Sequence, residues 1–392
     1  MEALYGRYSV RHSITHICSF RRDVALSGLA VGCRYETQGY ALGDHISAIQ
    51  AEDSNIVYVK PRSMAVSYQK EKQAAIEAVC RAAKLCTQVR SDMVDVGTLQ
   101  KGDKSPVTVA DFGAQALVCE HIKSVFPNDP IVGEEDAADL RKAENANQLD
   151  QVAKYVRRAH ESATPEAICG WIDEGNAHVA DRYWTLDPID GTKGFLRNDQ
   201  YAIALALIEN GDLKVGVLGC PALPLSFDDS NVPTGTLFVA VRGQGATMVS
   251  LNGGDAKSIR VGSESDQSSQ RFVESVEAAH GDHARQQAIA KAGGITQPSL
   301  RMDSQAKYGA VARGDAALYL RLPSPKYPDY REKIWDHAAG VLVVEEAGGR
   351  VTDMHGKPLD FGSDFKMNNN RGVVVSAGRI HDEVIAALAA SG

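Results

Sequence analysis

The sequence predicts a layered α/β fold, in which helices cover β-sheets. Two observations lead to this class. Segments with apolar residues three and four positions apart, the helical period, alternate along the chain with short apolar runs of strand length. The 392 residues also contain no long all-β run, no internal repeat and no low-complexity tract. Alternating helices and strands bury their apolar faces by stacking in layers.

The composition is that of an ordinary globular protein, with 44% hydrophobic and 23% charged residues. A net charge of −8 gives no overall attraction for nucleic acid or for an anionic membrane, so we expect neither as a partner. No run approaches the roughly 18 apolar residues that a membrane span needs. The seven cysteines include no CxxC pair and no zinc-finger spacing, which favours reduced thiols. We expect a monomer that acts on a small molecule.

Residues 1–60 differ from the rest and form a predicted N-terminal extension. The first 35 residues carry scattered serines, no lysine, two acids and five arginines, namely Arg7, Arg11, Arg21, Arg22 and Arg34. This composition is typical of an organelle transit peptide, for a chloroplast or a mitochondrion. An unconstrained extension on a cytoplasmic protein explains it equally well. We expect two domains beyond the extension, residues 61–221 and residues 222–392.

The individual elements follow from local patterns. Helical periodicity covers residues 68–93 and 109–126. Residues 136–177 are polar and weakly periodic, which predicts a surface insertion outside the core. Further strands are predicted at 131–132, 201–209, 213–219, 236–241, 271–276, 317–322 and 372–376, and further helices at 282–292, 305–313, 335–347 and 382–390.

The stretch WTLDPIDGTKGFL, residues 184–196, concentrates the chemistry. A strand pattern precedes Pro188, which has no backbone N–H and should end the strand. Asp187 and Asp190 then leave the strand end, and Gly191-Thr192 turns into a helix whose first N–H groups suit an anion such as phosphate. A simple Asp-Pro turn is the alternative explanation for a lone motif of this kind.

Six acids lie at the predicted ends of elements: Asp103, Asp111, Glu134, Asp187, Asp190 and Asp336. Taken singly, each could be a helix cap or a solvated side chain. Together they are hard oxygen ligands, which favour Mg²⁺, Mn²⁺ or Ca²⁺ over zinc. Two such ions can polarise a phosphoryl group and activate a water molecule. Because several acids close together repel one another, we expect a site that is poorly ordered without metal.

These motifs resemble a known family. KGDxxP with TxxD at 101–111, VGEE at 132–135, WTLDPIDGTKGFL and IWDHAAG at 334–340 are similar to the lithium-sensitive, magnesium-dependent phosphomonoesterase superfamily, which includes inositol monophosphatase and fructose-1,6-bisphosphatase. The resemblance covers about residue 69 to the C-terminus and leaves out residues 1–60. It implies an αβαβα sandwich, the inositol monophosphatase and fructose-1,6-bisphosphatase-like fold, and two or three Mg²⁺ ions.

The resemblance also implies roles for individual residues. Glu134, Asp187, Asp190 and Asp336 match the metal-binding carboxylates, and Ile189 matches a backbone carbonyl ligand. Gly191 and Thr192 match the turn that holds the phosphate. Thr192 would orient the attacking water with Asp111 behind it, and Asp103 would assist as a base. A hydroxyl paired with a carboxylate can pass on a proton in this way.

The second half resembles the nucleotidase branch of that superfamily, whose substrate is adenosine 3′,5′-bisphosphate. The matching residues would contact the adenosine and the second phosphate, and they are His280, Ser304, Lys307, Tyr308 and Arg321. Without the resemblance, Lys307 would be taken for a surface lysine and Arg321 for an exposed strand residue. Two alternatives remain open: the same chemistry on inositol phosphates, and a non-catalytic nucleotide-binding regulator.

Overall fold

The computed structural model describes residues 47–50, 56–59, 67–96, 109–227, 231–263, 270–276, 283–324, 326–327 and 329–391. The chain divides into two units, residues 1–67 and residues 68–392. In the first unit, β1 (Ser47–Gln50) pairs antiparallel with β2 (Ile56–Val59), inside the segment predicted to be an extension. A domain boundary near residue 221 stays a prediction; the strand β6 (Asp212–Pro224) runs across it.

The second unit alternates helices and strands. Its described helices are α2 (Gln69–Val96), α3 (Val109–Val125), the short 3₁₀ helix η1 (Ala143–Asn145), α4 (Ala146–Val156), α5 (Pro165–Asp173), α6 (Thr192–Leu196), α7 (His283–Ala292), α8 (Ala306–Ala312), α9 (Ala338–Glu346) and α10 (His381–Ala390). Its other described strands are β3 (Ile131–Gly133), β4 (Arg182–Asp190), β5 (Ala202–Glu209), β7 (Thr234–Val241), β8 (Gly245–Ser250), β9 (Lys257–Ile259), β10 (Phe272–Glu274), β11 (Leu300–Arg301), β12 (Leu318–Arg321), β13 (Arg350–Thr352) and β14 (Val373–Ser376).

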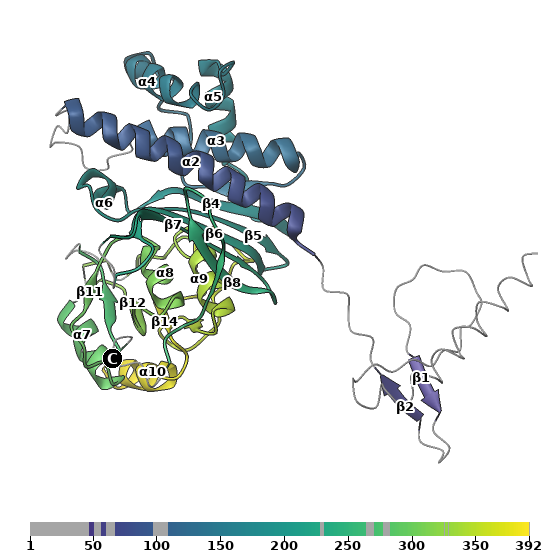
Figure 1. Cartoon of the computed structure of the whole chain (residues 1–392), viewed down its shortest axis with the longest axis vertical. Helices are drawn as coiled ribbons and strands as arrows, with labels where there is room; N and C mark the ends of the chain where they lie inside the picture. The colour runs from purple at the N-terminus through teal and green to yellow at the C-terminus, as the bar shows by residue number, and fades with distance from the viewer. Residues whose placement is uncertain are drawn as a thin grey trace, which may run out of the picture. The chain divides into compact units, whose positions relative to one another are not determined.

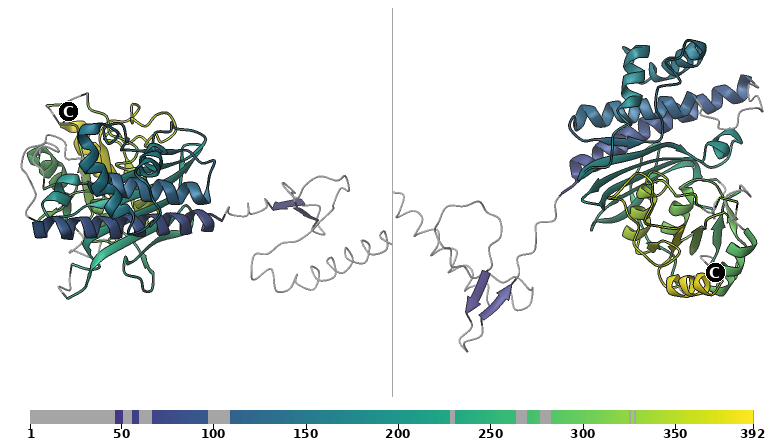
Figure 2. Two further views of the ribbon diagram at one scale, coloured as in Figure 1. Left: turned by 90° about the horizontal axis from the view of Figure 1, so that it is seen from above. Right: turned by 180° about the vertical axis from the view of Figure 1, so that it is seen from behind.

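The elements of this unit stack in five layers, and the predicted fold class is confirmed (Figures 1 and 2). Helices α2 and α3 cover one face of a seven-stranded sheet of order β3-β4-β5-β6-β7-β8-β9. Helices α8 and α9 lie between its other face and a five-stranded sheet of order β11-β10-β12-β14-β13. Helices α7 and α10 cover the outer face of that second sheet.

Strand β5 shows why the sequence produces layers. Its residues are nearly all buried, so it reads as a continuous apolar run, as expected for a strand covered on both faces. Ile203, Leu205 and Leu207 join the core on the α2–α3 side, whereas the alanines between them face α8 and α9. Small residues let α9 approach closely: a Cβ on Gly216 of β6 would lie 2.9 Å from the Ala339 carbonyl oxygen.

Two sequence predictions are wrong in detail. Strand β4 does not stop at Pro188; it continues to Asp190 with a shift of register against β5 between Asp187 and Asp190. The irregular step tolerates a residue without an N–H, because a bulge leaves one backbone group out of the ladder. The predicted helix 335–347 begins only at Ala338, so Asp336 lies in the turn before α9.

The segment 136–177 is not a mere surface insertion. It contains α4 and α5, whose apolar faces pack on α3, and Val152, Val156, Ile168 and Ile172 are buried in the main core. Thr164 caps α5, since its hydroxyl accepts a hydrogen bond from the Ala167 N–H at 3.2 Å. The two helices have only 11 and 9 residues, so the sequence contains few repeats of the helical period in this segment.

Two further properties concern the described residues only. None of their helices is both long enough and apolar enough to cross a membrane. The five cysteines among them, from Cys80 to Cys220, carry free thiols.

Candidate active site

Two strands of the large sheet end side by side, and each ends in acids. β3 and β4 are parallel, and Gly133 lies opposite Leu186. Glu134 directly follows the last residue of β3, and Asp187 directly follows Leu186 within β4. The two carboxyl groups lie close together, because after burial the charge of Glu134 is the largest cause that raises the pKa of Asp187. The carboxyl ends of parallel strands meet at one edge of a sheet, which is where ligands bind in α/β folds.

The bulge in β4 adds Asp190 to the same edge. Asp187 pairs with Ala204 of β5, and after the shift of register Asp190 pairs with Ala202. Asp187 is buried with 2% of its surface exposed, and Asp190 is partly buried. The negative charge of Asp190 acts on Asp187. Pro188 therefore does not end the strand; it occupies the irregular step that lies between the two carboxylates.

Asp336 reaches this edge from a different part of the unit. It lies in the turn before α9, a helix that packs directly on β5, β6 and β7. Its charge raises the pKa of Asp187, and in turn the charges of Asp190 and Glu134 raise its own pKa. The structure thus brings together four acids separated by about two hundred residues of sequence: Glu134, Asp187, Asp190 and Asp336.

The pKa values of this acid cluster are raised. Burial, followed by the charges of Glu135 and Asp111, raises the pKa of Glu134 to about 8, although its side chain keeps an exposed surface. Burial likewise raises the pKa of Asp336 to about 7, against the opposing effect of His337. Burial and Glu134 hold the pKa of Asp187 well above its usual range. The cluster therefore holds protons or needs added positive charge.

The donor set of the cluster fits a hard divalent cation. All four side chains offer carboxylate oxygens, the ligands that Mg²⁺ and Ca²⁺ prefer. Oδ1 of Asp187 is buried and has no hydrogen-bond partner among the described residues. Leaving such an oxygen unpaired costs about 1–3 kcal/mol, and more when it is charged. A cation at this oxygen would remove that cost, so the residues fit a metal site.

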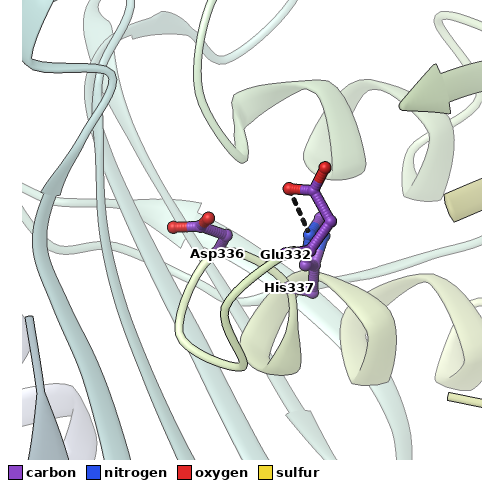
Figure 3. A group of neighbouring side chains, drawn as sticks. All are labelled: Glu332, Asp336 and His337. Atoms are coloured by element: carbon purple, nitrogen blue, oxygen red, sulfur yellow. Dashed lines mark hydrogen bonds and ion pairs between the residues drawn. The ribbon is translucent and has the colours of Figure 1, made fainter. Parts of the chain in front are cut away.

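Among the described residues, the potential metal-ligand atoms of Glu332, Asp336 and His337 lie within 4.8 Å of one another (Figure 3). Glu332 and His337 are already engaged. Glu332 pairs with Arg321 at 3.2 Å and with Nε2 of His337 at 3.4 Å, while Nδ1 of His337 bonds the Tyr308 hydroxyl at 2.7 Å.

Glu332 and Asp336 also differ in charge state. Despite its burial, Glu332 has a pKa of about 2, because Arg321 and His337 stabilise its negative charge. The Asp336 carboxylate points away from the Glu332–His337 pair in Figure 3. We therefore assign Asp336 to the acid cluster and regard Glu332 and His337 as its support.

The turn after β4 has the form that the sequence predicts. Gly191 has a φ of 88° and begins the five-residue helix α6. A Cβ at this position would lie 2.9 Å from the Ser304 Cβ, so glycine is needed both for its backbone conformation and for space. The Thr192 hydroxyl donates to the Ile189 carbonyl at 3.2 Å. The two residues with implied roles toward water and metal are therefore in contact.

Asp111 lies in the first turn of α3 and is 1% exposed. The charge of Asp111 raises the pKa of both Glu134 and Glu135. Asp111 therefore lies near the two acids that follow β3. Burial, followed by the charges of Asp111 and Asp136, raises the pKa of Glu135 to about 8. Glu135 is a neighbour of the site that the sequence argument left out, although the VGEE motif contains it.

The residues with implied roles toward the substrate differ in how far they are exposed to solvent. Ser304 lies against Gly191 with a φ of 67°. Lys307 is 3% exposed; burial lowers its pKa to about 8, against the opposing charges of Asp190 and Asp303. Arg321, partly buried at the end of β12, pairs with Glu332. Tyr308 is 1% exposed and bonds His337, which gives it a supporting position.

Two implied residues, Asp103 and His280, lie outside the described residues. Sequence reasoning also missed residues that hold the site from behind, namely Gln305, Glu332 and His337. IWDHAAG contained His337, and DSQAKY contained Gln305, but nothing in either motif showed what these side chains touch.

Comparison with known proteins decides the family. The model of the inositol monophosphatase family matches residues 64–392. The chain belongs to this family. Among curated relatives, the 3′(2′),5′-bisphosphate nucleotidase of Schizosaccharomyces pombe is 46% identical over 344 residues, covering 83% of this chain and 96% of the relative. Proteins of the same name from Emericella nidulans and Oryza sativa are 44% and 42% identical, each covering 82% of this chain and 98% and 94% of the relative.

Solved structures of the inositol monophosphatase family share the fold at lower identity. The inositol monophosphatase from Anabaena superposes with a TM-score of 0.53 at 23% identity and covers 82% of this chain and 96% of that chain. The Thermotoga maritima enzyme has a TM-score of 0.53 at 24% identity and covers 81% of this chain and 96% of that chain. At these identities the likeness concerns the fold alone. The predicted family and fold are confirmed.

Proposed function

We propose that this protein hydrolyses the 3′-phosphate of adenosine 3′,5′-bisphosphate to give AMP and inorganic phosphate. The observation that carries the proposal is the acid cluster beside the Gly191 turn, in a chain that matches curated nucleotidases over nearly their whole length. The sulfated relative of this nucleotide is a second substrate to test. Lithium should inhibit the reaction, as the family resemblance implies.

We propose that two or three Mg²⁺ ions bind at Glu134, Asp187, Asp190, Asp336 and the Ile189 carbonyl. When bound, such ions supply Lewis-acid activation of a water molecule and neutralise charge on the phosphoryl group. The raised pKa values and the unpaired Asp187 oxygen support this assignment, because both reflect excess negative charge. The number of ions is part of the proposal.

The roles of the other residues follow from their places. Backbone N–H groups at Gly191 and Thr192 would hold the departing phosphate, since the first N–H groups of a helix lack partners within it. The Thr192 hydroxyl would orient the attacking water, and Asp111 would take up its proton, with Asp103 assisting. Phosphoryl transfer needs mainly positioning and charge neutralisation, which this arrangement of residues can supply.

We propose that the second phosphate and the adenosine lie against Ser304, Lys307, Arg321 and His280. Arg321 is held in place by Glu332, so its guanidinium would meet the phosphate in a fixed orientation. The buried Lys307 would add positive charge beneath the site. A direct contact from Tyr308 stays a prediction, since its hydroxyl is engaged by His337.

A direct assay tests the proposal. The purified protein, with Mg²⁺, is given adenosine 3′,5′-bisphosphate, inositol 1-phosphate or inositol 1,4-bisphosphate at equal concentrations, and released phosphate is measured. We expect the nucleotide to have the highest kcat/KM. A preference for either inositol phosphate would replace the nucleotide with the alternative substrate class. No turnover of any of the three would favour the non-catalytic alternative.

The N-terminal segment calls for a separate experiment. We propose that the arginine-rich, acid-poor first 35 residues direct the protein to an organelle. Determination of the N-terminal residue of the protein isolated from cells tests this. A start at Met1 or Glu2, in protein recovered from the cytoplasm, would contradict it.

A further inference from the structure

The acids of the cluster come from two elements that are far apart in the sequence. Asp190 ends β4 in the large sheet, whereas Asp336 lies in the turn before α9, in the helical layer beneath it. A divalent cation shared by such carboxylates tolerates little error in their separation, since Mg²⁺ demands near-ideal geometry with ligands at about 2.0–2.1 Å. Some contact must therefore hold the sheet edge and the α9 turn at the correct spacing.

Gln305 makes contacts to both sides. Its backbone N–H donates to Oδ2 of Asp190. Its side-chain Nε2 donates to the Trp335 carbonyl at 2.9 Å, and its Oε1 accepts from the Gly340 N–H at 3.2 Å. Trp335 immediately precedes Asp336, and Gly340 lies in the first turn of α9. One residue thus bonds Asp190 directly and holds the backbone on both sides of Asp336.

The orientation of the Gln305 amide is fixed by a carbonyl acceptor on one side and an N–H donor on the other. The side chain is 1% exposed, and both its oxygen and its nitrogen have partners. A buried amide with both ends paired is rigid, because each lost hydrogen bond would leave a buried polar group unsatisfied. An apolar side chain of the same length would fill the space without these bonds.

The backbone that carries Gln305 is also fixed from the other side. Ser304 has a φ of 67°, a conformation that is strained for a non-glycine residue and persists only where the surroundings impose it. Asp303 imposes it in part, because its carboxylate accepts from Arg197, which caps α6, and from the Val276 N–H at 3.2 Å. The N–H of Gln305 is therefore held against Asp190 by independent anchors.

We propose that Gln305 is a positioning residue that sets the separation of Asp190 and Asp336, and through it the affinity of the site for divalent cations. The inference rests on the proposed metal site and goes beyond it, since Gln305 itself touches neither metal nor substrate. The alternative is that Gln305 only stabilises the packing of α9. The two differ in one measurable respect: a purely structural glutamine would affect unfolding without affecting metal affinity.

The test compares Gln305→Met and Gln305→Asn with the wild-type protein. Methionine keeps the length of the side chain without its hydrogen bonds, and asparagine keeps the amide but is one methylene too short to reach both partners. Mn²⁺ is the probe, and its binding is followed by the electron paramagnetic resonance signal of the free ion. We expect each variant to bind Mn²⁺ at least tenfold more weakly than wild type, and to need correspondingly more Mg²⁺ for half-maximal turnover.

Tyr183→Phe is the matched control. It removes a buried side-chain-to-backbone hydrogen bond, from Tyr183 to the Phe361 carbonyl, near the other end of β4. This variant should lose thermal stability and keep its Mn²⁺ affinity.

The outcomes separate the two proposals. Gln305 variants that lose stability but bind Mn²⁺ within twofold of wild type would overturn the positioning role and leave the proposed function intact. A wild-type protein that binds no Mn²⁺ would overturn both. If Gln305→Met fails to fold, the affinity of Gln305→Asn decides the question by the same criterion.

Discussion

The two ends of strand β4 each gather acids, but they balance the charge in opposite ways. At the start of the strand, Arg182 bonds three carboxylates, those of Glu71, Asp129 and Glu209. At the other end, Asp187 and Asp190 join Glu134 and Asp336, and their pKa values are raised. One end is rich in hydrogen bonds, whereas the other contains the unpaired Asp187 oxygen.

The start of β4 is a structural joint, by which we mean that Arg182 and its three carboxylate partners hold neighbouring segments together. Besides Arg182, the Trp184 Nε1 donates to Asp129 at 3.0 Å, and the Tyr68 hydroxyl donates to Glu209 at 2.7 Å. These bonds tie the start of α2 and the loop before β3 to the sheet. The acids here have their cation and their donors within the chain, so nothing further needs to bind.

The difference shows how acids in a structural joint can be told from acids in a site. Buried like charges are tolerable only when a cation, a proton or a dense set of donors offsets them. The chain supplies the cation at the start of β4. At its end Lys307 and Arg321 lower the pKa of Asp190, yet burial keeps it raised. This end of β4 thus has excess negative charge that a divalent cation could neutralise.

Removal of a carboxylate from the end of β4 that has excess negative charge should have the strongest effect. In Asp187→Asn we expect turnover of the nucleotide to fall about a thousandfold, because the proposed metal site would lose a buried ligand worth several kcal/mol in the transition state. The metal-free variant should be more stable than wild type, since one repulsive charge is gone. Phosphate release and thermal unfolding in EDTA measure the two effects. Unchanged turnover would contradict the assignment of Asp187 to the metal.

The balanced end should respond in the opposite manner. In Arg182→Met we expect a loss of about 2 kcal/mol of unfolding free energy, less than for a fully buried pair because the side chain is 30% exposed. Turnover per folded molecule should be unchanged. Urea unfolding and active-site-normalised kinetics test this. As a control, Arg350→Met removes a more exposed pair with Asp382 and should cost much less.

A smaller effect is expected from a conservative substitution at the proposed substrate site. Arg321→Lys keeps the charge that Glu332 needs but loses the planar fork that suits a phosphate. We expect KM for adenosine 3′,5′-bisphosphate to rise about tenfold, with KM for an inositol monophosphate unchanged. Arg242→Lys, in a pair with Glu345 at 2.7 Å, is the matched control and should alter neither. Equal losses on both substrates would argue that Arg321 does not read the second phosphate.

The smallest expected effect is on the dependence of stability on pH. Glu134 and Asp336 have pKa values of about 8 and about 7, above their values in the unfolded chain. Groups with raised folded-state pKa values favour folding below the unfolded pKa and lose that contribution as the pH rises.

The metal-free protein should therefore have a Tm lower by about 2–4 °C at pH 8 than at pH 5, whereas saturating Mg²⁺ should remove or reverse this slope. Calorimetry in EDTA and in Mg²⁺ compares the two. A metal-free Tm that is higher at pH 8 than at pH 5 would contradict the unbalanced charge of the cluster.

The kinds of residue that build the site, and their places along the chain, could be predicted before the fold was known. Hard oxygen donors at the ends of apolar strands predicted a divalent-cation site, and alternating helical and strand periods predicted layers. The prediction of layers is confirmed, because the local period depends on near neighbours in the sequence, whereas the cation site stays a prediction. Asp187 and Asp190 could be singled out in this way, as could Gly191, whose positive φ and crowded position require glycine.

Which charged side chains contact one another depends on the fold and could not be predicted from the sequence. The burial of α4 and α5, the passage of β4 through Pro188 and the engagement of Tyr308 by His337 depend on contacts between distant segments. Arg182 and Lys307 are both basic residues near acids, yet one completes a joint and the other lies buried beneath a site. The physical reason is that the energy of a charge depends on burial and on the charges around it. Both are set by the packing of layers, to which residues more than a hundred positions apart contribute.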